Sequence, residues 1–185
     1  MLDEFLEEAE LEMEEALDSI RRELAQLRTG RATPALVDGI IIDAYGAKTP
    51  LKQMANISIP EARLIVIQPW DKNVLPEIEK AIQKSDLGIN PSSDGKLIRL
   101  SIPPLTEERR RDLVKLAKKI GEEGKVRIRR LRRDSIESLK TSEKKGDIPE
   151  DESKKMQDEV QKLTDKYSQK IDDTLKDKEN EIMHF

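Results

Sequence analysis

The first 28 residues carry an apolar pattern typical of a helix. Their apolar positions recur at steps of three and four, at Leu2, Leu6, Ala9, Met13, Ala16, Ile20, Leu24 and Leu27. Residues at this spacing share one face, so the pattern predicts a helix from Leu2 to Arg28. Nine acids and no base occupy the first twenty positions, which suits the positive end of a helix dipole. We expect Thr29-Gly30 to end the helix.

The middle of the chain has a different pattern. Short β-branched runs bounded by Gly, Pro, Asn and Asp occupy residues 40–42, 56–59, 63–67 and 97–100. Such runs predict the strands of a small sheet. Between them, apolar residues at helical spacing predict one short helix over residues 73–85. The middle is therefore expected to form a compact β/α/β unit.

Two further long helices are predicted after Pro103-Pro104. The first starts at the N-cap Thr106 and runs to about Lys144, with Leu113, Leu116, Ile120, Leu131 and Leu139 on one face. Gly146 and Pro149 turn the chain. The second carries a stripe formed by Met156, Val160, Leu163, Tyr167, Ile171, Leu175 and Ile182.

Three apolar stripes predict a three-helix bundle, so the fold class is α+β. The bundle comprises residues 1–29 and 105–185, and residues 30–104 form the inserted domain. Its linkers are residues 29–32 and 102–104. Because two linkers lie close together, we expect them to act as a hinge and not as a free tether.

Composition supports a folded binding protein. Charged residues make up 39% and aromatic residues 3%, but the net charge is only -4, so interleaved charges on solvated helix faces explain the composition better than disorder. Cysteine is absent, which excludes disulfides and thiolate metal sites. Neither a secretory signal nor a membrane span is apparent, so we expect a soluble cytoplasmic protein and no membrane partner.

The sequence lacks the residue patterns of an enzyme. It has no phosphate-binding loop, no metal-ligand cluster and no nucleophile with a base, and its one histidine, His184, is the penultimate residue. We therefore expect no catalytic residues, no metal and no cofactor.

A basic cluster is the most informative feature. The segment from Glu107 to Arg133 contains twelve Lys and Arg residues but only five acids. At about 100° per residue, most of them form one stripe opposite the apolar face. The stripe contains Arg111, Lys115, Lys118, Lys125, Arg129, Arg132 and Arg133.

The basic stripe has two simple explanations and one functional one. It can be a solvated helix face, or it can pair with the acidic first helix. The functional interpretation is phosphate binding, because guanidinium groups offer bidentate donors to phosphate. No aromatic residue lies beside the stripe, which favours docking on the backbone of folded RNA over base stacking.

Five motifs of the chain resemble those of bacterial ribosome recycling factors, and the resemblance extends over its whole length. They are Arg28-Thr29-Gly30-Arg31-Ala32, Asp86-Leu87-Gly88-Ile89-Asn90-Pro91, Pro103-Pro104-Leu105-Thr106-Glu107-Glu108-Arg109-Arg110, Arg132-Arg133-Asp134 and Gln161-Lys162-Leu163-Thr164-Asp165.

This resemblance implies an L-shaped monomer that binds the large ribosomal subunit after termination. With elongation factor G and GTP it would split the ribosome into subunits, releasing mRNA and tRNA, and the GTPase chemistry would belong to the partner. It further implies that Arg129 and Arg132 are ribosomal RNA contacts, to which the stripe adds Arg133, Lys125, Lys118 and Arg111. The implied hinge residues are Arg28, Thr29, Gly30, Arg31, Pro103 and Pro104.

The sequence is also compatible with two other functions. One is a scaffold that pairs its helices with another coiled coil, and it would need a second, exposed apolar stripe. The other is an RNA-binding module unrelated to termination.

Overall fold

The computed structural model describes residues 2–184, which divide into two compact units. One unit contains the residues up to Thr29 and those from Glu107 to His184. The other runs from Gly30 to Thr106. The predicted α+β class, a helical bundle with a small inserted domain, is confirmed.

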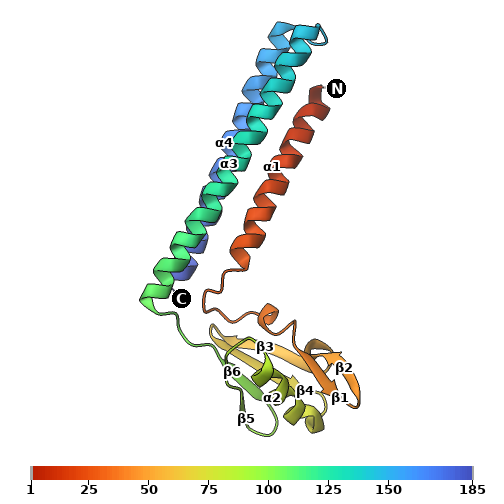
Figure 1. The fold of residues 1–185 in the computed structure, drawn as a ribbon, viewed down its shortest axis with the longest axis vertical. Coiled ribbons are helices and arrows are strands. Elements are labelled where there is room, and N and C mark those ends of the chain that lie inside the picture. The colour runs from red at the N-terminus through yellow and green to blue at the C-terminus, as the bar shows by residue number, and fades with distance from the viewer. Residues whose placement is uncertain (1, 185) are drawn as a thin grey trace. The chain divides into compact units, whose positions relative to one another are not determined.

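The first unit is a bundle of three helices, α1 (Leu2–Ala25), α3 (Glu107–Lys145) and α4 (Glu150–His184). α3 and α4 are antiparallel neighbours joined by a turn at Gly146, and α1 packs along both of them (Figure 1). At 1.5 Å per residue α3 is about 58 Å long. A helix of this length can present charged residues on several successive turns.

The interior of the bundle is apolar. Its central cluster consists of Met13, Ala16, Leu17, Ile128, Tyr167 and Ile171. A second cluster, closer to the turn, contains Leu139, Met156 and Val160. Leu116, in contrast, is 44% exposed and does not pack with the rest of the predicted apolar face of α3.

α1 ends earlier than the sequence pattern predicts, at Ala25 and not at Arg28. The backbone N–H of Leu27 donates to the carbonyl oxygen of Leu24 at 3.2 Å, a bond that tightens the final turn. Thr29 is buried, and its hydroxyl donates to Glu181 of α4 at 3.0 Å. Residues 26–29 lie outside the helix, and this bond holds their end against α4.

The second unit contains six strands, one α-helix and three short 3₁₀ helices. Its strands are β1 (Ile41–Ala44), β2 (Ala47–Pro50), β3 (Ala55–Glu61), β4 (Leu64–Pro69), β5 (Ser92–Ser93) and β6 (Ile98–Ser101). α2 (Leu75–Lys84) follows a short 3₁₀ turn, Lys72–Val74, close to the predicted helix. The strands form a β1–β2 hairpin and a four-stranded antiparallel sheet in the order β3-β4-β6-β5.

One hydrophobic core joins the two sheets to α2. α2 contacts β1 and buries Leu75, Ile78 and Ile82 in the same cluster as Ile42 and Ile67 (Figure 1). The sequence pattern does not predict β2 and β5, because neither strand carries a β-branched run. It therefore predicts a single sheet where the structure has two.

Candidate nucleic-acid interface

The predicted basic stripe of α3 lies on the side of the helix away from the bundle core. The core-facing side of α3 buries Leu113, Ala117, Ile120 and Ile128. On the other side, Arg111, Lys118, Arg129 and Arg133 are exposed, whereas Lys125 and Arg132 are partly buried. We call these six residues the basic face.

One edge of the basic face is turned toward α4. Lys118 lies 4.0 Å from Glu179, and Lys125 forms an ion pair with Asp172. One heptad further on, Nη1 of Arg132 donates to Oε1 of Gln161 at 2.8 Å. The contacts run in opposite directions along the two antiparallel helices; on α3 they recur every seven residues, whereas on α4 they step by seven residues and then by eleven.

The remaining edge of the basic face is open to solvent. Arg129 lies 2.8 Å from Glu122 on its own helix, with both side chains more than half exposed, and Arg111 pairs with Glu107 one turn away. Exposed pairs of this kind contribute about 0–1 kcal/mol, so a phosphate can replace the acid at little cost. Arg133 forms no ion pair within residues 2–184.

The acids of α1 do not neutralise the basic face. Within the described residues no ion pair joins the six basic-face residues to α1. Glu10 of α1 pairs instead with Lys166 of α4 at 2.6 Å, and Glu14 lies 3.8 Å from Lys170. The hypothesis that the acidic first helix pairs with the stripe is therefore wrong for this part of the chain.

Tyr167 occupies the seam between α1 and α4. Its ring is 1% exposed, and its hydroxyl donates to Glu14 and, at 3.1 Å, to Glu10. Burial, followed by these two carboxylates, raises the pKa of Tyr167. Hydrogen bonds from Lys166 and Tyr167 lower the pKa of Glu10. The acids on this side of α1 thus stabilise the bundle.

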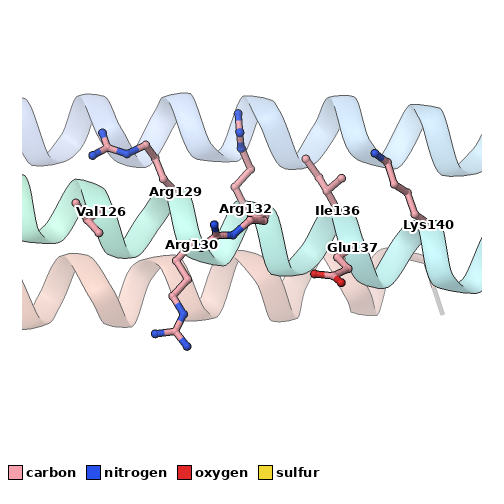
Figure 2. A pocket seen from close by; sticks show the side chains of 8 residues that line it. Val126, Arg129, Arg130, Arg132, Ile136, Glu137 and Lys140 are labelled. Atoms are coloured by element: carbon pink, nitrogen blue, oxygen red, sulfur yellow. The ribbon is translucent and has the colours of Figure 1, made fainter.

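An open groove of about 650 Å³ lies at the C-terminal end of the basic face and extends beyond it, lined by Val126, Arg129, Arg130, Arg132, Arg133, Ile136, Glu137 and Lys140. Figure 2 shows Arg129, Arg132 and Lys140 pointing toward α4, while Arg130 points toward α1. The basic stripe predicted from the sequence includes neither Arg130 nor Lys140, although both line the groove. Lys140 lies one heptad after Arg133, so extending the helical spacing beyond Arg133 would have found it.

Arg132 differs from its neighbours on the basic face. Its Nε is buried and has no hydrogen-bond acceptor among the residues that the structure describes. A buried donor without an acceptor costs about 1–3 kcal/mol of fold stability, so contacts of Nε do not explain the position of this side chain.

The predicted hinge residues occupy two adjacent linkers. Gly30 has φ +79°, and a Cβ on it would lie 3.4 Å from Cγ of Leu105 and 3.9 Å from the carbonyl oxygen of Pro103. Arg28, Arg31, Pro103 and Pro104 are exposed. The positive φ explains why a glycine stands between Thr29 and Arg31.

Residues 2–184 contain neither a metal-binding cluster nor a membrane-spanning helix. No group of three or more acidic or histidine side chains there could hold a metal ion. No helix in this range is long and apolar enough to cross a membrane.

Comparison with known proteins points to one family. The family model for ribosome recycling factor matches residues 20–183. The ribosome-recycling factor of Desulforamulus reducens is 58% identical over 183 residues, covering 99% of both chains. That of Halalkalibacterium halodurans is 56% identical with the same coverage.

Two solved structures are similar over the whole chain. A solution structure of the ribosome recycling factor has a TM-score of 0.72 and 47% identity, and the match covers 100% of this chain and 98% of the other. The second comprises models of the T. thermophilus ribosome recycling factor and the E. coli elongation factor G bound to the E. coli post-termination complex. It has a TM-score of 0.61 and 45% identity, with 99% of both chains covered.

Proposed function

Because this chain belongs to the ribosome recycling factor family, we propose that it docks the basic face of α3 on ribosomal RNA of the large subunit. With elongation factor G and GTP it then splits the post-termination ribosome into subunits in the cytoplasm, so that mRNA and tRNA are released. The chain itself is a non-enzymatic translation factor, and elongation factor G is the GTPase.

The observation that carries the docking proposal is the distribution of charge over the bundle. The exposed edge of α3 presents Arg129 and Arg133, whose guanidinium groups suit bidentate contacts with phosphate oxygens. α1 has exposed acids at Glu8, Glu12 and Glu15, which would repel a phosphate backbone. RNA should therefore approach the bundle from the α3 side.

The aromatic residues favour recognition of the RNA backbone over recognition of bases. Tyr167 is buried in the bundle, and the exposed Tyr45 and Trp70 belong to the inserted unit. Since base stacking needs an exposed ring, the basic face is suited to phosphate contacts.

Short anchored linkers support a hinge between the two units. On the bundle side Thr29 is bonded to Glu181. In the inserted unit the N–H of Ala32 donates to the carbonyl oxygen of Ala62 at 2.8 Å, and that of Ile102 donates to Arg63 at 2.9 Å. These anchors flank Gly30 on one linker and Pro103-Pro104 on the other, where we place the proposed hinge. We propose that elongation factor G acts on this hinge during splitting.

The scaffold function receives no support from the described surface. The exposed large apolar residues of the bundle are Leu11, Leu116, Val126 and Met183, which are distributed over three helices. A second coiled-coil partner would need them on one stripe.

A splitting assay with purified post-termination ribosomes, elongation factor G and GTP tests the proposal. Light scattering should fall as subunits separate, and the variant carrying Arg129→Ala and Arg133→Ala should split them at least about tenfold more slowly, because two charge-assisted contacts are lost. Arg21→Ala is the matched control, since Arg21 is also exposed and pairs with an acid of its own helix, but on α1. Equal rates for the parent and the double variant would contradict docking by the basic face.

A further inference from the structure

Along the seam between α3 and α4, the basic residues of α3 contact two kinds of side chain on α4. Lys118 and Lys125 face the carboxylates of Glu179 and Asp172, which offset part of their positive charge. Arg132, at the next heptad position, faces the side-chain amide of Gln161. A neutral amide can fix the direction of a guanidinium without removing its positive charge.

A second hydrogen bond fixes the direction of this amide. Nε2 of Gln161 donates to Oδ1 of Asp165 at 2.9 Å, while Oε1 accepts from Arg132 at 2.8 Å. If the amide group of Gln161 were flipped by about 180°, its NH₂ would face the donors of Arg132 and its oxygen would face the carboxylate of Asp165. Both contacts would be repulsive, so Asp165 holds the Gln161 oxygen toward Arg132.

We propose that Gln161 and Asp165 are positioning residues for Arg132: they hold its guanidinium ready for an RNA phosphate and leave its charge available. The inference rests on the proposed docking of the basic face. Fixing a flexible arginine before binding lowers the entropic cost of the contact.

Two substitutions at Gln161 distinguish the effect of positioning Arg132 from the effect of its positive charge. Gln161→Met keeps the length of the side chain and removes both hydrogen bonds, so binding to purified large subunits should weaken about three- to tenfold. Gln161→Glu keeps an acceptor for Arg132 but neutralises it, so binding should weaken about tenfold. The salt slope of Gln161→Glu should also fall by roughly 0.7 to 0.9, the loss of one phosphate contact.

Gln169 offers a matched control on the same helix. Its Nε2 donates to Asp173 at 3.0 Å, the same i to i+4 arrangement, but it bonds to no arginine of α3. Gln169→Glu adds the same charge to α4 and should bind within about twofold of the parent protein. A loss equal to that of Gln161→Glu would show that added negative charge alone weakens binding, and would overturn the inference.

A double-mutant cycle decides whether Gln161 acts through Arg132. In an Arg132→Ala background, Gln161→Met should change the affinity less than about twofold, because no guanidinium remains to position. The inference is overturned if the full loss persists in that background, since Gln161 would then act independently of Arg132.

The same cycle separates the two proposals. If Arg132→Ala weakens binding and Gln161→Met does not, the proposal that the basic face docks on RNA is supported, and the proposal that Gln161 positions Arg132 is wrong. If Arg132→Ala leaves both affinity and salt slope unchanged, docking through Arg132 fails, and positioning fails with it. Circular-dichroism melting curves for all variants provide the check on folding.

Discussion

Gly124 allows α1 and α3 to approach closely at the centre of the bundle. A Cβ at this position would lie 2.7 Å from Cγ1 of Ile20 and 3.4 Å from Cδ1 of Ile171. Ile20 is 3% exposed and packs in the bundle interior, so it has little room to move. Gly124→Ala should therefore push α1 away from α3.

Two opposing effects set the magnitude of this change. Replacing a helical glycine by alanine gains about 1 kcal/mol of helix propensity. Overpacking a filled core costs about 1 to 3 kcal/mol. We expect a net loss of about 1 kcal/mol in the free energy of unfolding, or about 3 °C in Tm for a chain of this size. Urea denaturation and thermal melting of the full chain measure both quantities.

Gly121→Ala is the control for the Gly124 prediction. A Cβ at Gly121 would meet chiefly the terminal methyl Cδ2 of Leu175, at 2.9 Å, and Leu175 is only partly buried. That methyl can rotate away, so the gain in propensity should remain and stability should be unchanged or higher by about 0.5 to 1 kcal/mol. If Gly124→Ala proves as stable as Gly121→Ala, the close approach at Ile20 does not limit the packing.

Three further predictions concern other parts of the chain. Tyr167→Phe should lower the free energy of unfolding by about 1 kcal/mol in urea denaturation, since it removes the hydroxyl that donates to two carboxylates of α1. Gly30→Ala should slow subunit splitting while large-subunit affinity stays within about twofold, because alanine disfavours the φ of +79° in the linker; unchanged splitting would count against the hinge. The Asp94 carboxyl, which accepts from the N–H groups of Leu97 and Lys96 and from Arg99, should titrate by carbon NMR near its pKa of about 2, below the ordinary 3.8. Because the folded pKa is the lower one, its contribution to stability should be full above pH 3.8 and disappear as the pH falls toward 2.

The amino-acid pattern predicts the parts of the fold where periodicity is strong. The three bundle helices follow from apolar stripes, and the turn after Lys145 follows from Gly146 and Pro149. β2 and β5 are missed because Lys48-Thr49 and Ser92-Ser93 are held in strands by backbone pairing and not by buried side chains.

The basic face was predictable as a set of charges but not as a set of contacts. Helical spacing places Arg132 on the same stripe as Arg129. It does not reveal that Arg132 bonds to Gln161 whereas Arg129 pairs within its own helix, because this depends on the register between α3 and α4. The Gln161 motif supports the family resemblance, but only the structure shows which side chain it contacts.

The salt dependence of large-subunit binding tests the central claim most directly. The variant carrying Arg129→Ala and Arg133→Ala removes two exposed cations of the basic face, so its plot of log affinity against log salt should be flatter than the parent's by about 1.5. Its melting temperature should stay close to that of the parent, since exposed charged residues contribute within about 0.5 kcal/mol of zero. Parent-like affinity and slope in this variant would show that the basic face is a solvated surface and not the site of RNA docking.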